Sequence, residues 1–325
     1  MNRLTYAVAA VTLLGGAAIA QNTRLTGNVK IDGSSTVFPI TEAVAEEFKK
    51  EAPRVNVTVG ISGTGGGFKR FGVGETDLSN ASRPIKKTEH DACVANRIEY
   101  IEIPVAFDGL SIVVNPKNTW CSTITLDEIK KIFTDGSTVT KWSDVRPEWP
   151  ARPIKIYAPG TDSGTFDYFK EVVVGDKGAV RADMQVSEDD NVLVRGVTGD
   201  EGAIGFFGCA YYFENQNKLK VLKVDAGKGG VEPTPETIEN GTYAPFSRPL
   251  FIYVNKKSAL RPEVKGFVEF YLKHAAELAA EVGYVALPSE IYARASANFK
   301  AGKTGTQFMD EKGEKITGPV TKVYK

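Results

Sequence analysis

The chain is poor in the side chains that bind metals and has no excess of charge. Its 325 residues include two His and three Cys, and Lys plus Arg equal Asp plus Glu at 40 each. No Cys or His spacing matches a zinc site. The balanced charge gives no general affinity for nucleic acid or acidic polymers, so any anion must be bound by a local site. The sequence therefore predicts no metal, no cofactor and no nucleic-acid partner.

Nucleotide-binding loops are also lacking. The glycine-rich run that begins at Gly60 never continues into Gly-Lys-Ser/Thr, and no turn supplies Gly-x-Gly-x-x-Gly. The sequence thus excludes the two commonest loops that hold nucleotide phosphates.

The first twenty residues are typical of an export signal. Arg3 supplies the positive start, residues 6–14 form a short apolar run, and Ala18-Ile19-Ala20 is a small-x-small cleavage site. No cysteine follows that site, so a lipid anchor is not indicated, and no later segment is apolar enough to cross a bilayer. We expect a signal peptide over residues 1–20, cleaved near Ala20, and a soluble protein that is exported from the cytoplasm.

An odd number of cysteines would then enter an oxidising compartment. Cys93 and Cys121 have polar, loop-like surroundings, and they are the pair that we expect to form a disulfide. Cys209 lies in the apolar run 203–210 and is expected to be a buried free thiol.

Strands alternate with helices along the remaining chain, which is long enough for two domains. The pattern predicts strands at 29–31, 55–59, 98–103, 110–114, 154–157 and 249–254, and helices starting near Pro39, Phe68, Thr125, Phe166 and Val264. This alternation predicts an α/β fold with largely parallel sheets. Binding residues are then expected where strands end and helices begin.

Three such turns are rich in hydroxyl groups and glycine. They are Ser34-Ser35-Thr36-Val37, Ser62-Gly63-Thr64-Gly65 and Asp162-Ser163-Gly164-Thr165. Backbone N–H groups at a helix start lack intrahelical partners and carry partial positive charge, so these turns suit a small oxyanion. A fourth turn, Ser82-Arg83, adds a guanidinium whose planar fork matches paired oxygens.

Simpler interpretations of these turns remain open. Ser, Thr and Asp are ordinary helix caps, and the glycine-rich run is also consistent with a flexible loop. Arg83 has the alternative of pairing with a nearby carboxylate such as Asp77, which is the usual situation of an arginine.

Six segments together point to one family. They are 32–39, 60–69, 80–85, 105–110, 160–166 and 202–207, and they occur over nearly the whole chain in the family's order. On these segments the chain resembles the phosphate-binding proteins of bacterial Pst-type ABC transporters, which are periplasmic substrate-binding proteins. The resemblance implies a type II periplasmic-binding-protein fold, in which two α/β lobes are joined by two crossing strands with the ligand in the cleft. Lobe I would comprise residues 24–108 plus 250–325, and lobe II residues 109–249.

The resemblance also implies a set of phosphate-binding residues. The residues expected to bind phosphate are Ser35, Thr36, Val37, Thr64, Ser82, Arg83, Ser163, Gly164 and Thr165, and Ser62 is an alternative to Thr64. The best-known members have an aspartate where this chain has Arg83, and an arginine where it has Pro159. Our hypothesis is that Arg83 replaces the missing cation. Asp108 or Asp162 is expected to replace the missing acceptor, which would bond a protonated phosphate oxygen and reject sulfate.

The expected function is therefore capture of inorganic phosphate and its delivery to the membrane permease of an ABC importer, by a monomer that is not an enzyme. One alternative is a phosphate-ester hydrolase, although the surroundings of Ser163 differ from the Gly-x-Ser-x-Gly elbow. His90 and His274 are the only histidines, and both are expected in ordinary helix positions. The other alternative is a protein that binds sulfate, arsenate or a phosphonate.

Overall fold

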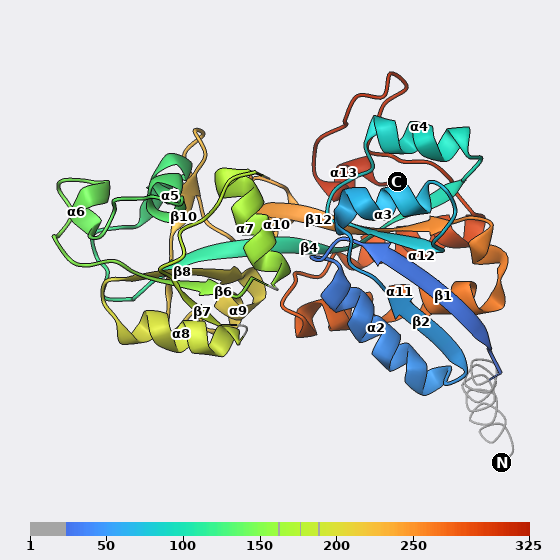
Figure 1. Ribbon diagram of the computed structural model, residues 1–325, viewed down its shortest axis with the longest axis horizontal. Helices are drawn as coiled ribbons and strands as arrows, with labels where there is room; N and C mark the ends of the chain where they lie inside the picture. Colours follow the sequence, from blue (N-terminus) through green and yellow to red (C-terminus); the bar gives the residue numbers. More distant parts are fainter. Residues whose placement is uncertain (1–23, 162, 176, 188) are drawn as a thin grey trace, which may run out of the picture. The chain divides into compact units, whose positions relative to one another are not determined.

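A computed structural model describes residues 24–161, 163–175, 177–187 and 189–325, and the chain divides into two compact units (Figure 1). Unit 1 comprises the described part of Met1–Pro104 together with Phe251–Leu278 and Tyr292–Glu314. Unit 2 comprises Val105–Leu250, Ala279–Ile291 and Lys315–Lys325. Unit 1 is thus built from distant parts of the chain. The lobe boundaries given in the sequence analysis stay a prediction.

Unit 1 is organised around a mixed sheet in the order β2-β1-β3-β12. Its strands are β1 (Gly27–Gly33), β2 (Val55–Val59), β3 (Leu78–Ala81) and the second half of β12 (Ser247–Asn255). β1 runs parallel to β2 and β3, whereas β12 is antiparallel to β3. In unit 1, therefore, the expected parallel sheet has one antiparallel edge.

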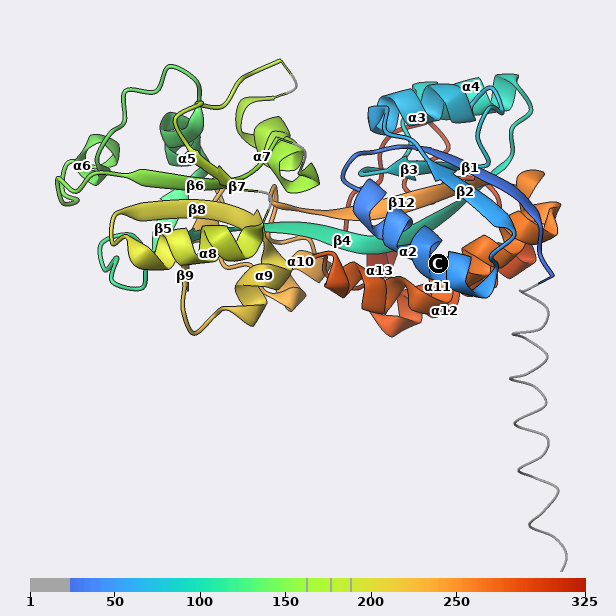
Figure 2. The ribbon, with the colours of Figure 1, turned by 60° about the horizontal axis from the view of Figure 1, so that its bottom comes forward.

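Helices cover both faces of this sheet. They are α2 (Phe38–Glu51), α3 (Gly63–Phe71), α4 (Lys87–Ala95), the short η1 (Ser258–Leu260), and most of α11 (Pro262–Glu281) and α12 (Ser289–Ala301). In Figure 2, α3 and α4 lie above the sheet and α2 and α11 lie below it. Pro39 stands in the first turn of α2, where a missing N–H costs nothing. Phe48 on α2 packs edge-on against Phe267 of α11, with ring centroids 5.5 Å apart, so this helix pair buries aromatic surface below the sheet.

Unit 2 has a second mixed sheet, in the order β4-β8-β6-β7 with β9 also paired to β4. The strands are β4 (Tyr100–Val114), β6 (Lys155–Pro159), β7 (Gln185–Ser187), β8 (Ala203–Gly208) and β9 (Lys220–Val221). β6 is parallel to β7 and β8, and β4 is antiparallel to β8 and β9. A separate sheet, β11-β10-β5, contains β5 (Thr123–Thr125), β10 (Lys223–Asp225) and β11 (Gly230–Val231).

The helices of unit 2 are mostly short. They are α5 (Leu126–Phe133), α6 (Trp142–Val145), α7 (Gly164–Val174), α8 (Asp190–Gly199), α9 (Cys209–Glu214), α10 (Pro235–Glu239) and α13 (Val320–Val323). The predicted cap of α5 is confirmed, because Thr125 and Glu128 form a reciprocal capping box. Phe169 of α7 stacks on Phe206 of β8 with ring centroids 3.7 Å apart, which holds α7 against the sheet.

Two local predictions differ from the structure. Residues 98–103 and 110–114 were expected as two strands, but β4 is a single strand of 15 residues, all of them buried. Extended backbone continues through the intervening segment because its backbone groups are paired there: the N–H of Phe107 donates to the carbonyl of Val285 at 2.8 Å. The expected Cys93–Cys121 disulfide is wrong, since both thiols are free and buried. Cys209 is a buried free thiol, as predicted.

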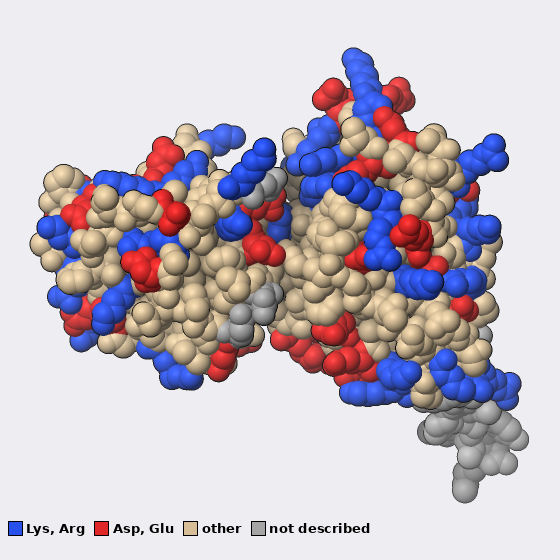
Figure 3. All heavy atoms as spheres, viewed as in Figure 1, with Lys and Arg blue, Asp and Glu red and all other residues tan. Residues whose placement is uncertain are grey.

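The surface and the hydropathy of the described residues agree with the charge balance of the sequence. Figure 3 shows Lys and Arg interspersed with Asp and Glu on the visible face of each unit. Within the described ranges, no helix has the length and apolar character needed to cross a membrane. The expected signal peptide at residues 1–20 lies outside the described residues.

Candidate functional site

Unit 1 brings three of the predicted turns together at the ends of β1, β2 and β3. The N–H of Ser34 donates to the carbonyl of Asn80 at 3.0 Å, and the N–H of Ser62 donates to the carbonyl of Gly33 at 3.0 Å. The turn after β1 is therefore hydrogen-bonded to the turns on either side of it. This juxtaposition follows from the parallel order β2-β1-β3, which places the three carboxyl ends at one edge.

Glycine allows this close approach at two positions. Gly33 has φ +141°, and a Cβ there would lie 2.2 Å from the carbonyl oxygen of Asn80. A Cβ on Gly67 of α3 would lie 2.5 Å from the Cα of Gly33. Any side chain at either position would push the turns apart, since neither contact can relax by a rotamer change.

Thr64 and Ser82 form the polar contact between the second and third of these turns. Their hydroxyl oxygens are 3.1 Å apart, and the N–H of Ser82 also donates to Thr64 Oγ1 at 3.1 Å. Ser62, the alternative to Thr64, is exposed and makes no side-chain cap for α3. The structure therefore groups Thr64 with Ser82 and leaves the Ser62 side chain outside that contact.

The first turn presents the start of α2. Thr36 and Val37 are buried, Ser35 is half-buried, and Val37 occupies the cap position of the helix. Behind this turn, Thr41 Oγ1 donates to Asn80 Oδ1 at 3.0 Å. The first helical turn of α2 is thus tied to β3 by a side-chain bond as well as by the backbone.

Arg83 is engaged within unit 1. Its two terminal nitrogens donate to the two carboxylate oxygens of Glu89 at 2.9 and 2.7 Å, and one of them also donates to the carbonyl of Pro84 at 3.1 Å. The alternative of a carboxylate partner thus describes the observed geometry, with Glu89 in place of Asp77. Asp77 instead pairs with Arg261 at 2.5 Å. Direct contact between Arg83 and an anion stays a prediction.

In unit 2 the third predicted turn caps α7. The side chain of Ser163 accepts from the N–H of Thr165 at 3.2 Å, and Gly164 is buried at the first helical position. Ser163 and Thr165 are half-buried. Asp162, which was one candidate acceptor, lies outside the described residues. The predicted helix start is confirmed, and the binding of an anion by its N–H groups stays a prediction.

Asp108 and Arg248 form a charged pair inside unit 2. Arg248 Nε donates to Asp108 Oδ2 at 3.4 Å, and the two side chains are 14% and 1% exposed. Arg248 Nη1 donates to Glu171 Oε2 at 2.8 Å, and its guanidinium carbon lies 3.7 Å from the ring centroid of Tyr168. The sequence analysis missed Arg248. The signal that could have identified Arg248 is its position: it is a charged residue next to the apolar strand expected at 249–254.

Burial raises the pKa of Asp108 from 3.8 to about 6. Nearby Arg248 opposes this rise by stabilising the carboxylate, whereas Glu171 adds to it. Tyr168 and Cys209 are the other titratable groups that sense this charge, and burial raises the pKa of both. Asp108 Oδ1 is buried and has no hydrogen-bond partner among the described residues.

Both histidines have contacts within unit 1. His90 Nδ1 is hydrogen-bonded to Tyr100 Oη at 2.7 Å, and His274 packs on Phe270 with ring centroids 4.3 Å apart. Among the described residues, no group of three or more His, Cys, Asp or Glu is arranged to hold a metal.

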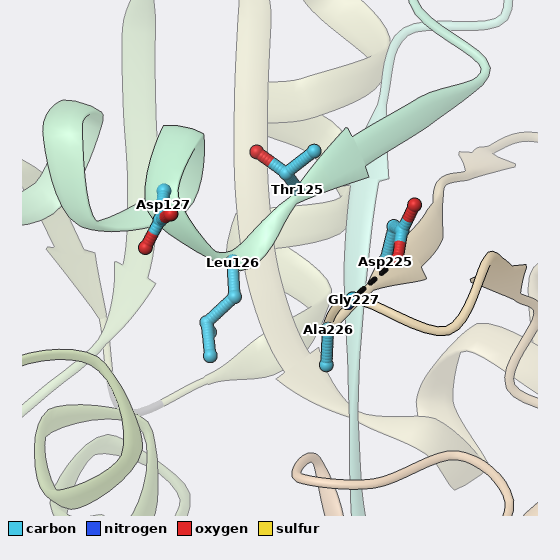
Figure 4. Close-up of a pocket in the computed structure, with 6 residues that line it drawn as sticks. All are labelled: Thr125, Leu126, Asp127, Asp225, Ala226 and Gly227. Carbon is cyan, nitrogen blue, oxygen red and sulfur yellow. Dashed lines mark hydrogen bonds between the residues drawn. The ribbon is translucent and has the colours of Figure 1, made fainter.

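A shallow pocket of about 300 Å³ lies elsewhere in unit 2 and contains none of the predicted site residues. It is lined by Thr125, Leu126, Asp127, Asp225, Ala226 and Gly227 (Figure 4). Asp225 accepts from the N–H of Gly227 at 2.8 Å, which closes the loop after β10. Figure 4 shows Asp127 and Asp225 on opposite sides, so the pocket does not bring the two carboxylates together.

The chain is similar to known proteins over most of its length. A family model described as "PBP superfamily domain" matches residues 18–274. Protein SphX of Synechococcus elongatus is 53% identical over 293 residues, covering 89% of this chain and 86% of that protein. The phosphate-binding protein PstS of Staphylococcus saprophyticus is 44% identical over 296 residues, covering 89% and 90%. A crystal structure of "a possible phosphate binding protein" from Planctomyces limnophilus is 47% identical with a TM-score of 0.83, covering 86% and 99%.

Two α/β units with the chain passing between them along β4 and β12 are the type II periplasmic-binding-protein fold, which is the class of a substrate-binding protein. The chain belongs to the PBP superfamily and, within it, to the Pst-type phosphate-binding proteins.

Proposed function

We propose that this protein captures inorganic phosphate outside the cytoplasm and delivers it to the permease subunits of an ABC importer. The observation that carries the proposal is the set of hydrogen-bonded turns at the ends of β1, β2 and β3, each rich in hydroxyl groups and two of them starting a helix. Such turns bind oxyanions through neutral donors, without a strongly basic surface.

The proposed phosphate contacts come from both units. They are Ser35, Thr36, Val37, Thr64, Ser82 and Arg83 in unit 1, and Ser163, Gly164 and Thr165 in unit 2. Each hydrogen bond to a charged oxygen is worth about 1.5–3 kcal/mol. A few such donors therefore suffice for tight binding of a small ion, provided that folding has already positioned them.

The same observations support a carrier over an enzyme. The family consists of substrate-binding proteins, and the residues around Ser163 differ from the Gly-x-Ser-x-Gly elbow of a hydrolase. We propose that the protein acts as a monomer, needs no cofactor and is exported by cleavage near Ala20. The buried carboxylate of Asp108 favours phosphate over sulfate, because a carboxylate can accept a bond only from an oxyanion that still carries a proton.

The test is titration calorimetry of the purified protein with phosphate, arsenate and sulfate. We expect phosphate binding in the wild type and a loss of tenfold or more in Thr64→Val and in Ser163→Ala, since each removes a hydroxyl without adding bulk. Thr88→Val is the matched control, because Thr88 is exposed at the start of α4. Absence of phosphate binding in the wild type, or full affinity in both variants, would refute the proposal. Ion chromatography of the denatured protein identifies any anion that co-purifies.

A further inference from the structure

Arg248, the partner of the proposed acceptor Asp108, has no role in the phosphate contacts proposed so far. Asp108 is 0% exposed and its Oδ1 lacks a partner among the described residues. An ion pair taken out of water seldom gains stability over apolar side chains of similar size. An orphaned carboxylate oxygen adds a further desolvation cost. A contribution to folding stability alone therefore does not explain why this ion pair is buried.

Tyr168 places this pair beside the start of α7. Tyr168 follows Gly164 by four residues and Thr165 by three, so the three lie on one face of the helix. Helical side chains lean towards the N-terminus, so the Tyr168 side chain is directed towards the turn that Gly164 and Thr165 form. Arg248 stacks on the Tyr168 ring at 3.7 Å and donates to Glu171 three residues further on. Its guanidinium thus contacts the second turn of α7, next to the turn at which the helix begins.

Since the argument rests on the proposed function, we infer that Arg248 is the cation and Asp108 the hydrogen-bond acceptor that hold phosphate at the start of α7. The planar guanidinium pairs two phosphate oxygens, and the carboxylate accepts the proton that phosphate still carries at neutral pH. Sulfate carries no such proton, so binding it would set two bare anions against each other. Glu171 is 54% exposed and is the partner that the phosphate displaces from Arg248.

Arg83 is less suited to this role. Both of its terminal nitrogens are bound to Glu89, and the two side chains are 26% and 14% exposed. Glu89 also accepts from the N–H of Lys86 at 2.9 Å, where it closes the cap of α4. Freeing the Arg83 fork would break a bidentate pair between two part-buried side chains. Arg248 is bound to Glu171 by a single hydrogen bond, and that carboxylate is 54% exposed.

The experiment compares phosphate and sulfate binding by calorimetry at pH 7.5 in the wild type and four variants. Arg248→Gln should weaken phosphate binding at least a hundredfold, and this loss should exceed that of Arg83→Gln at least tenfold. Asp108→Asn should improve sulfate binding relative to phosphate at least tenfold, because an amide can donate to a fully ionised oxygen. Arg152→Gln is the matched control, since Arg152 forms an exposed ion pair with Glu201 in the same unit.

The double variant Arg248→Gln/Asp108→Asn guards against a folding defect, because Arg248→Gln alone leaves Asp108 buried without its counter-ion. It leaves no buried charge without a counter-ion, and it should fold by circular dichroism while losing phosphate affinity at least a hundredfold. Phosphate affinity within threefold of wild type in the double variant would overturn the inference, as would a larger loss in Arg83→Gln than in Arg248→Gln. A wild-type protein that binds no phosphate would instead refute the proposed function itself.

Discussion

Glu102 is a fully buried carboxylate whose protonation should make the stability of unit 1 depend on pH. Its Oε2 accepts from Tyr253 Oη at 2.8 Å and from Thr306 Oγ1 at 2.5 Å, and its Oε1 accepts from the N–H of Gln307 at 2.9 Å. Burial outweighs these three bonds, so the pKa rises from 4.5 to about 7. The nearby Tyr100 is un-ionised over this range, since burial raises its pKa far above neutrality.

The sign of the effect follows from proton linkage. The folded state holds the Glu102 proton more tightly than the unfolded state, so the stabilisation is complete below about pH 4.5 and is lost as the pH rises through 7. At 1.36 kcal/mol per pKa unit, the loss is about 3 kcal/mol. Glu102→Gln cannot titrate, so its free energy of unfolding relative to wild type should increase by about 3 kcal/mol between pH 4.5 and pH 8.

Urea unfolding at pH 4.5, 6 and 8, followed by far-UV circular dichroism, measures this difference. All three tryptophans, Trp120, Trp142 and Trp149, belong to unit 2, so their fluorescence would not report on unit 1. Glu99→Gln is the control, because Glu99 is 63% exposed and its relative stability should not vary over this range. A constant difference between Glu102→Gln and wild type from pH 4.5 to pH 8 would refute the reasoning.

Three further predictions concern the binding turns and the packing beneath them. Gly33→Ala should destabilise unit 1 by about 3 kcal/mol or more in urea unfolding and weaken phosphate binding, because the new Cβ would lie 2.2 Å from the carbonyl of Asn80; an unchanged midpoint would contradict this. Phe169→Ala should cost about 3–5 kcal/mol through the cavity left beside Phe206, and a loss below 1 kcal/mol would show that the stack is not needed. The preference for phosphate over sulfate should fall between pH 7.5 and pH 5 in competition calorimetry, because protonation of Asp108, with its pKa of about 6, turns an acceptor into a donor; a preference that does not change with pH would count against Asp108 at the site.

Local sequence patterns predicted the structure correctly where a few neighbouring residues determine it. The capping box of Thr125 and Glu128, the Pro39 start of α2 and the Ser163 start of α7 were all predicted from spacing and are present. The alternation of strand, polar turn and helix also predicted the α/β class. These features depend on short-range sterics and hydrogen bonds, which the order of residues specifies directly.

Pairings between distant residues were predicted poorly. Cys93 lies inside α4 in unit 1, and Cys121 lies in unit 2, so polar surroundings in the sequence said nothing about their separation. Arg83 was expected near Asp77 if it paired at all, and its partner is Glu89. Spacing alone does not tell which of several carboxylates an arginine meets, because the choice depends on how α4 folds back over β3.

The sequence by itself determined where the donors for an oxyanion stand along the chain, since hydroxyl groups, glycine and helix starts are local properties. Only the tertiary structure decided which charges accompany them. Asp108 and Arg248 are separated by 140 residues along the chain and meet because β4 and β12 carry both into the interior of unit 2. Burial there makes the two charges depend on each other, and burial is a property of the packed fold rather than of any segment.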